Sequence, residues 1–374
     1  MKIGIMTFWW SQDNYGQILQ CYALQKYLRD AGHDAFVIKY DRDKDYYRSK
    51  FRYMKIFNPI FLIKYCIRKV NLMKEGKLVI KDRNFQTFKN KIVFSEENYS
   101  SYKQLKNNCP IADVYIVGSD QVWNCFNLKK TFVKNVKRAF SLEFVPSNKM
   151  IVSYAASFGS DDVLSCHKEY IKRQIEKFEY ISVRESSGVQ ILKDLGIKKD
   201  VFVDPDPTFL VNVENYRELK KKPKFYNGEE FIFLYLLDNQ YNFNFDYLTN
   251  FAKERKLKIY FVVGNQKKKQ YPYDVVYPSI EEWLYMIDNA KYIITNSFHC
   301  SVFSSLFHKS FGVVKLADVD AKMNSRFSQL FDLLKIEERY INNDDYSILD
   351  KSYDCSIIAL ENAKIRFKDF INEL

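Results

Sequence analysis

The stretch AKYIITNSFHCSVFSSLFHKSF, residues 290–311, predicts a strand that feeds directly into a helix. Its apolar run Tyr292–Ile294 is typical of a buried strand, and Ser301–Phe307 is typical of a helix. Such a turn points several backbone N–H groups and the positive end of the helix dipole at one spot. That spot suits a phosphate or a carboxylate. His299 adds a side chain that titrates near neutral pH, so we expect a reaction centre here.

Outward from this stretch, short strands and helices alternate along the chain, which predicts an α/β fold with mainly parallel sheets. We expect two Rossmann-like domains. The N-terminal domain is predicted over residues 1–218, with a basic insertion at about 42–95. The C-terminal domain is predicted over residues 219–374, with its last helix packing back on the N-terminal domain. Ligands of such folds bind at the carboxyl ends of strands, in the crevice between the domains.

Composition narrows the class of protein further. The 374 residues are 47% hydrophobic and hold only 11 Gly and 8 Pro, so disorder is not expected. The N-terminus begins directly with a strand pattern rather than a signal peptide, and no apolar run approaches the ~20 residues needed to span a bilayer. The seven cysteines have no metal-like spacing, which favours reduced thiols, no metal site and a cytoplasmic protein.

The net charge of +12 is concentrated in residues 48–83, where eleven Lys and Arg stand against Glu75 and Asp82. Aromatic residues interrupt the basic ones. This segment is compatible with ordinary surface helices or with peripheral contact to the inner face of an anionic membrane. Nucleic-acid binding is disfavoured because nothing else in the chain resembles a nucleic-acid module.

Four further motifs follow predicted strands or open predicted helices. Asn14–Gly16 lies between the first strand and helix, where it either approaches a ligand or forms a plain N-cap turn. Gly118–Asn124 gathers polar groups after a buried strand, and its Asp120 is either a base or a helix cap. Arg184 either pairs with Glu185 or binds an anion. Arg326 either supplies a second cation or decorates a helix.

Taken in order, these motifs resemble the polysaccharide pyruvyl transferase family. They span residues 1 to about 335, nearly the whole chain. Members of this family are similar in fold to two-domain glycosyltransferases of the GT-B type, so the resemblance implies a GT-B-like arrangement of the two domains. The matching pieces are Asn14-Tyr15-Gly16 followed by LQCYALQKYL, VGSDQVWN at 117–124, SVRE at 182–185, DPT at 206–208, ITNSFH at 294–299 and NSRF at 324–327.

The resemblance implies an enzyme that moves pyruvate from phosphoenolpyruvate to two sugar hydroxyls, forming a cyclic ketal on a bacterial surface polysaccharide, such as a capsule or exopolysaccharide, or on its lipid-linked precursor. No cofactor is expected. His299 and Asp120 are the predicted catalytic residues. The predicted donor-binding residues are Arg184, Arg326, Ser297, Asn296 and Ser301. The predicted acceptor-binding residues are Asn14, Gly16, Ser119, Gln121 and Trp123.

Two residues depart from the family pattern, one at the predicted anion site and one, more mildly, after the first turn. Cys300 stands where the family usually has glycine after the histidine, and Gln17 stands where alanine usually follows Gly16. A glycine after the histidine would let a phosphate come close to the backbone.

The alternative functions are a GT-B-type glycosyltransferase that uses a nucleotide sugar, and a non-catalytic scaffold at a membrane surface.

Overall fold

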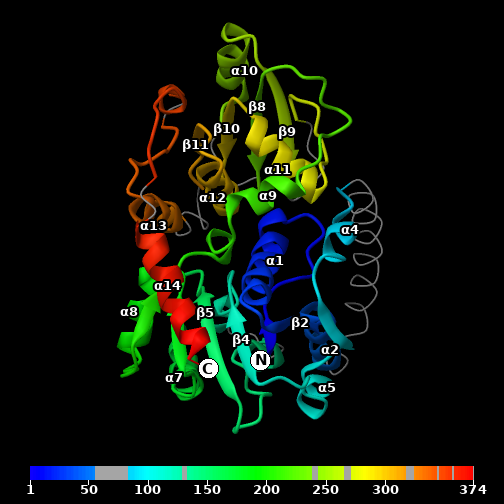
Figure 1. The fold of residues 1–374 in the computed structure, drawn as a ribbon, viewed down its shortest axis with the longest axis vertical. Coiled ribbons are helices and arrows are strands. Elements are labelled where there is room, and N and C mark those ends of the chain that lie inside the picture. Colours follow the sequence, from blue (N-terminus) through cyan, green and yellow to red (C-terminus); the bar gives the residue numbers. More distant parts are fainter. Residues whose placement is uncertain are drawn as a thin grey trace. The chain divides into compact units, whose positions relative to one another are not determined.

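The computed structural model describes residues 1–54, 83–128, 133–237, 243–264, 271–316, 324–342, 345–355 and 358–373 (Figure 1). The chain divides into two compact units, each assembled from three segments. Unit 1 comprises Met1–Ser11, Gln17–Leu78 and Lys89–Leu210. Unit 2 comprises Gln12–Gly16, Val79–Phe88 and Val211–Leu374. The basic segment 48–83 lies largely outside the described residues.

Unit 1 is built on a parallel sheet which, in the described part of the chain, has seven strands in the order β3-β2-β1-β4-β5-β6-β7. The strands are β1 (Lys2–Met6), β2 (Asp34–Tyr40), β3 (Phe94–Tyr99), β4 (Val114–Gly118), β5 (Met150–Ala156), β6 (Tyr180–Val183) and β7 (Val201–Val203). The strand order reverses between β1 and β4, which is where doubly wound sheets bind ligands. The loops after these two strands are therefore the natural ligand loops of this unit.

Helices connect the strands of unit 1. They are α1 (Tyr15–Asp30, whose first two residues belong to unit 2), α2 (Arg42–Met54), α4 (Phe85–Lys89, mostly in unit 2), α5 (Tyr102–Asn107), α6 (Lys134–Phe140), α7 (Lys168–Ile175) and α8 (Ser186–Asp194), with 3₁₀ turns η1 (Asn124–Asn127), η3 (Ser165–His167) and η4 (Pro207–Phe209). Helix α1 ends before Gly32, whose φ of +89° matches the left-handed position that follows many helices.

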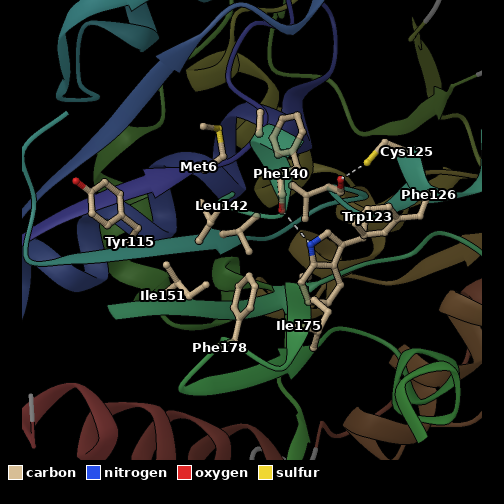
Figure 2. Close-up of a cluster of buried hydrophobic side chains, with 14 of the residues drawn as sticks. Met6, Tyr115, Trp123, Cys125, Phe126, Phe140, Leu142, Ile151, Ile175 and Phe178 are labelled. Atoms are coloured by element: carbon tan, nitrogen blue, oxygen red, sulfur yellow. Dashed lines mark hydrogen bonds between the residues drawn. The ribbon is translucent and has the colours of Figure 1, made fainter. Parts of the chain in front are cut away.

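The hydrophobic core of unit 1 contains Trp123, which the sequence had suggested as an acceptor contact (Figure 2). The indole is fully buried, and its N–H donates to the carbonyl of Phe140 at 3.1 Å. Its ring packs against the rings of Phe158 and Phe178. A side chain without exposed surface cannot stack on a sugar, so the acceptor role of Trp123 is replaced by a structural one.

Strand β3 was not predicted from the sequence, and only its first two residues, Phe94 and Ser95, fall in the insertion predicted at about 42–95. It pairs with β2 at the edge of the sheet, and most of its side chains are exposed or half-buried. An edge strand with little burial lacks the apolar run or alternation by which strands are recognised. Helices α2 and α4 fall in the same stretch, so its described ends belong to the α/β architecture.

Unit 2 carries the second parallel sheet, with four strands among the described residues in the order β11-β10-β8-β9. The strands are β8 (Phe231–Leu236), β9 (Lys258–Val263), β10 (Tyr292–Thr295) and β11 (Phe311–Val313). The helices are α9 (Val213–Leu219), α10 (Phe245–Glu254), α11 (Ile280–Asn289), α12 (Phe298–Leu306), α13 (Ser325–Leu334) and α14 (Ile358–Asn372), with the 3₁₀ turn η6 (Ser347–Leu349). The order reverses between β8 and β10, so this sheet has a switch point of its own.

The observed division differs from the predicted boundary between residues 218 and 219. Helix α9 belongs to unit 2, where it packs on α11 and the Tyr216 ring meets Phe303 edge-on at 4.9 Å. Nothing in the sequence predicts that Gln12–Gly16 belongs to unit 2, because its place there depends on contacts with residues more than 200 positions away. Helix α14 clusters with unit 2 and contacts α13. Its predicted packing on the N-terminal domain stays a prediction.

Among the described residues, no helix is both long enough and apolar enough to cross a membrane.

Candidate functional site

The turn between β10 and α12 is the centre of the candidate site in unit 2. Helix α12 begins at Phe298, earlier than the predicted start at Ser301. The cause is Ser297, the N-cap residue, whose hydroxyl accepts from the backbone N–H of Cys300 at 3.4 Å. His299 therefore lies in the first turn of the helix, as the sequence predicted, where backbone N–H groups lack intrahelical acceptors.

Asn296 bridges the switch point of the unit 2 sheet. Its side-chain oxygen accepts from the backbone N–H of Leu237, just after β8, at 2.7 Å. The Asn296 side chain is almost fully buried, and its Nδ2 has no hydrogen-bond partner within the described part of the chain. A buried amide donor with no acceptor is costly by about 1–3 kcal/mol, which favours a ligand acceptor at this position.

Gly16 lies against the ring of His299. A Cβ atom added to Gly16 would be 2.2 Å from both Cγ and Nδ1 of that imidazole. Real atoms do not approach so closely, so only glycine leaves room for the ring here. Gly16 was predicted to bind the acceptor. In the structure it lies against the ring of His299, the predicted catalytic residue.

Arg326 reaches the same region from the first turn of α13. Its guanidinium carbon lies 5.9 Å from the centroid of the Phe298 ring, and that ring meets the imidazole of His299 edge-on at 5.5 Å. Arg326 and His299, both predicted site residues, therefore each contact the ring of Phe298 in unit 2.

Cys300 and Ser301 turn into the protein rather than toward a ligand. Both side chains are fully buried. Burial raises the pKa of the Cys300 thiol to about 12, so the thiol is neutral at physiological pH. The Ser301 hydroxyl donates to the carbonyl of Ser297 at 3.2 Å. Ser301 is therefore bonded within its own helix, and we do not retain it as a donor-binding residue.

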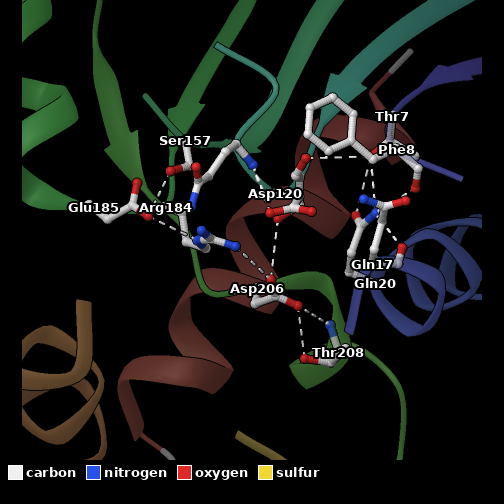
Figure 3. Close-up of polar contacts among 12 residues, drawn as sticks. Thr7, Phe8, Gln17, Gln20, Asp120, Ser157, Arg184, Glu185, Asp206 and Thr208 are labelled. Carbon is white, nitrogen blue, oxygen red and sulfur yellow. Dashed lines mark hydrogen bonds and ion pairs between the residues drawn. The ribbon is translucent and has the colours of Figure 1, made fainter. Parts of the chain in front are cut away.

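Arg184, the predicted donor ligand of the N-terminal domain, is held by two acids in unit 1 (Figure 3). Its Nε lies 3.0 Å from Glu185 Oε1, and its Nη1 lies 3.2 Å from Asp206 Oδ2. Burial opposes the charge on this guanidinium, but the carboxylates of Glu185, Asp206 and Asp120 outweigh burial and raise its pKa. Of the two interpretations left open by the sequence, the structure shows the pairing with Glu185.

Asp206 was missed as the second partner of Arg184, although it lies in the DPT motif. Its other oxygen, Oδ1, accepts from the backbone N–H and the hydroxyl of Thr208. Its Oδ2 also lies 3.4 Å from the hydroxyl of Ser119, a fully buried residue that the sequence had assigned to the acceptor. SVRE and DPT therefore form one buried polar cluster, and Ser119 is part of it.

Asp120 follows β4 at the switch point of the unit 1 sheet. Its φ of +61° is in the left-handed region, which Asp tolerates better than most residues and which often marks functional sites. Its carboxylate accepts from the N–H of Gln121 at 2.8 Å, and its carbonyl accepts from the N–H of Ser157 at 3.0 Å. Asp120 and Gln121 are half-buried. They stay the predicted acceptor side of the site, together with Asn14.

Two doubly wound units, each with polar residues at its switch point, define a Rossmann-like α/β enzyme class. The model of the family described as polysaccharide pyruvyl transferase matches residues 14–315. The chain therefore belongs to the polysaccharide pyruvyl transferase family, which is a family of enzymes. No match was found among the curated proteins.

Solved structures of similar fold are UDP-GlcNAc 2-epimerases. The enzyme from Methanocaldococcus jannaschii gives a TM-score of 0.53 at 13% identity, and its complex with UDP-GlcNAc and UDP gives 0.50 at 14% identity. The enzyme from Neisseria meningitidis bound to UDP-GlcNAc gives 0.51 at 10% identity. In each case 100% of both chains is covered. At such identities the likeness concerns the fold alone, and it confirms the predicted two-domain α/β class.

Proposed function

We propose that the protein transfers pyruvate from phosphoenolpyruvate to a pair of hydroxyls on a sugar of a surface polysaccharide or its lipid-linked precursor. The observation that carries this proposal is the strand-to-helix turn of unit 2, which holds both His299 and the buried Nδ2 of Asn296, with Arg326 placed over the Phe298 ring of the same turn. Phosphoenolpyruvate presents a phosphate and a carboxylate on a small skeleton. A guanidinium, an amide donor and the N–H groups of a helix start are the groups that bind such anions.

The proposed reaction forms two C–O bonds at the enol carbon, the first by addition and the second by displacement. One sugar hydroxyl adds to that carbon while the methylene carbon gains a proton and becomes a methyl group. The second hydroxyl then displaces the phosphate, which leaves with the second hydroxyl proton. His299 would deliver the first proton or bind the phosphate, and Arg326 would stabilise charge on the leaving group. Asp120 would accept a proton from the sugar.

Arg184 is not carried into this donor site. Its guanidinium already pairs with the buried carboxylates of Glu185 and Asp206. Two carboxylates beside one guanidinium leave no net positive charge there to attract an anionic donor.

Two measurements test the proposed donor. Phosphate release from phosphoenolpyruvate is followed across a panel of lipid-linked sugars, and release that depends on one acceptor supports the proposal. Thermal shifts then compare phosphoenolpyruvate with nucleotide sugars. A donor present at 100 times its Kd stabilises the folded state by about 2.7 kcal/mol. Stabilisation by a nucleotide sugar alone would support the glycosyltransferase alternative, which the fold comparisons do not favour.

Peripheral contact of segment 48–83 with an anionic membrane is part of the proposal, because a lipid-linked acceptor stays at that surface. The support is the charge of the sequence, eleven Lys and Arg against two acids. Binding to phosphatidylglycerol vesicles is expected to weaken as salt rises, since surface charges are screened. A variant without this segment that binds the vesicles equally well would contradict the idea.

A further inference from the structure

Arg83 is a fully buried guanidinium that holds the loop Gln12–Gly16 in unit 2. Its Nη1 donates to the carbonyl of Asp13 at 2.9 Å, and its Nη2 donates to the carbonyl of Val263 at the end of β9. The guanidinium carbon also lies 5.6 Å from the ring centroid of Tyr15. One side chain thus ties the loop to the carboxyl end of a strand.

Tyr15 gives the same loop a second anchor. Its ring stacks on Trp283 of α11 with centroids 5.0 Å apart and an angle of 8° between the planes. Its hydroxyl donates to the carbonyl of Pro278 at 2.7 Å, and burial raises the pKa of the phenol well above its usual value. Arg83 and Tyr15 therefore fix the backbone on either side of Asn14.

The residue that follows this anchor is Gly16, whose Cα faces the Nδ1 edge of His299. Since the gap admits no Cβ atom, a small shift of the loop would either crowd the imidazole or release it. The orientation of His299 thus depends on where Arg83 and Tyr15 hold the loop.

Stability alone gives a weak reason for a charged side chain at position 83. Removing a charge from water costs several kcal/mol, and hydrophobic residues of similar volume often replace buried charges without loss. The hydrogen bonds of Arg83 go to neutral carbonyls rather than to a carboxylate. The guanidinium instead fixes the position of the loop, because its planar fork binds two carbonyls of different segments at once.

We propose that Arg83 is a positioning residue for His299, acting through the loop Gln12–Gly16. The link to catalysis rests on the proposed function, whereas the link to the orientation of the ring does not. Losing the fork lets the loop move, and the imidazole then loses its fixed place. A misplacement of about 1 Å in an active site can lower turnover about 10²-fold.

The chain offers a matched control in Arg339, a second fully buried arginine of unit 2. Arg339 also binds carbonyls, those of Phe311, Ile348 and Lys351, and it also lies over an aromatic ring, that of Tyr353. These partners are far in sequence from residues 12–16. Replacing Arg339 therefore reports what the loss of a buried guanidinium does to the fold alone.

The test uses the full-length chain with labelled histidine side chains. The protein has four histidines, and a His299→Gln variant identifies the His299 resonance. Arg83→Lys, Arg83→Met, Arg339→Lys and Arg339→Met are compared by the NMR chemical shifts of the His299 ring at fixed pH, by melting temperature and by kcat and KM. Arg83→Lys keeps the charge but loses the fork, which keeps the test open where Arg83→Met unfolds.

We expect both Arg83 variants to change the ring chemical shifts of His299 and to lower kcat about 10²-fold, with a smaller change in KM. Both Arg339 variants should lower the melting temperature and leave the His299 shifts unchanged. Unchanged His299 shifts in folded Arg83→Lys would overturn the proposal. Changed shifts with unchanged kcat would keep the positioning role and contradict the catalytic role of His299.

Discussion

The carboxyl ends of the two sheets carry opposite chemistry. In unit 1, the cation Arg184 is enclosed by Glu185 and Asp206, and the nearby Asp120 adds further negative charge. In unit 2, His299 and Arg326 gather at a helix start beside a buried amide donor. Both sites follow from the same doubly wound topology, so topology places a site and side-chain pairing decides its charge. This difference in charge is the reason we propose unit 2 as the side that binds the anionic donor.

The largest expected effect follows from removing the imidazole of unit 2. We expect His299→Ala to lower kcat by ~10²–10⁴-fold, the range for loss of a general acid or base. The measurement is phosphate release at saturating phosphoenolpyruvate. His308→Ala, at the far end of the same helical segment and exposed, is the control and should stay close to the parent. Turnover of His299→Ala within twofold of the parent would remove the catalytic assignment.

The next prediction concerns the enclosed cation of unit 1. Arg184→Met should destabilise the protein by about 3–5 kcal/mol, because Glu185 and Asp206 would be left buried without their counter-charge. Urea denaturation followed by fluorescence measures the loss. Arg138→Met removes a half-buried pair with Glu143 in the same unit and should cost about 1 kcal/mol or less. Equal losses of unfolding free energy in the two variants would contradict the larger contribution expected of the buried Arg184 pairs.

A smaller effect, confined to turnover, is expected from Gly16→Ala. The added methyl group would meet the His299 ring at 2.2 Å, so the loop or the ring must move, and kcat should fall by about 10²-fold. Gly4→Ala in β1 is the control, since its nearest neighbour would be a side-chain atom of Tyr115 at 3.2 Å. If both variants keep parental turnover, the contact between Gly16 and His299 has no bearing on catalysis.

The smallest expected effect is a pH dependence of the free energy of unfolding. It distinguishes Lys89 from Arg83, the two cations that hold the loop after β1. Lys89 donates to the carbonyl of Trp10 in unit 1, and burial lowers its pKa to about 8. Between that value and the unfolded value near ~10.4, the unfolded chain binds more protons than the folded chain. The free energy of unfolding should therefore rise with pH in this window.

Denaturation curves at pH 8, 9 and 10 measure this slope, and Lys89→Met should reduce it. Arg83→Met should leave the slope unchanged, because a guanidinium does not titrate in this range. An equal slope in the parent and in Lys89→Met would contradict the assignment of the pH dependence to Lys89.

Much of the fold could be predicted because buried parallel strands are continuous apolar runs. The apolar run Tyr292–Ile294 was predicted as a buried strand for that reason, and β10 spans Tyr292–Thr295 with its last three residues buried. The exposed edge strand β3 carries no such signal and was missed. Helix α12 was predicted to begin too late, because the N-cap role of Ser297 depends on one hydrogen bond rather than on periodicity.

For the candidate site, local sequence placed the residues but not their partners. His299 in a helix start followed from a strand ending in Thr-Asn-Ser, and Arg326 near a helix start followed from its own motif. Trp123 and Ser119 were assigned to a ligand because they stand in a polar motif, yet both are fully buried. A motif reports which residues are near a strand end, whereas burial depends on the helices that cover that end.

The sequence by itself determined that this chain alternates strands and helices and that it carries the family motifs in order, and it predicts an anion site after residue 295. These are local properties of propensity, capping and spacing. Only the tertiary structure decided that Arg184 is paired with Asp206, that Gly16 lies against His299, and that Arg83 holds the loop Gln12–Gly16. Those contacts join residues tens to hundreds of positions apart, and they exist only when the packed sheets bring the strand ends together.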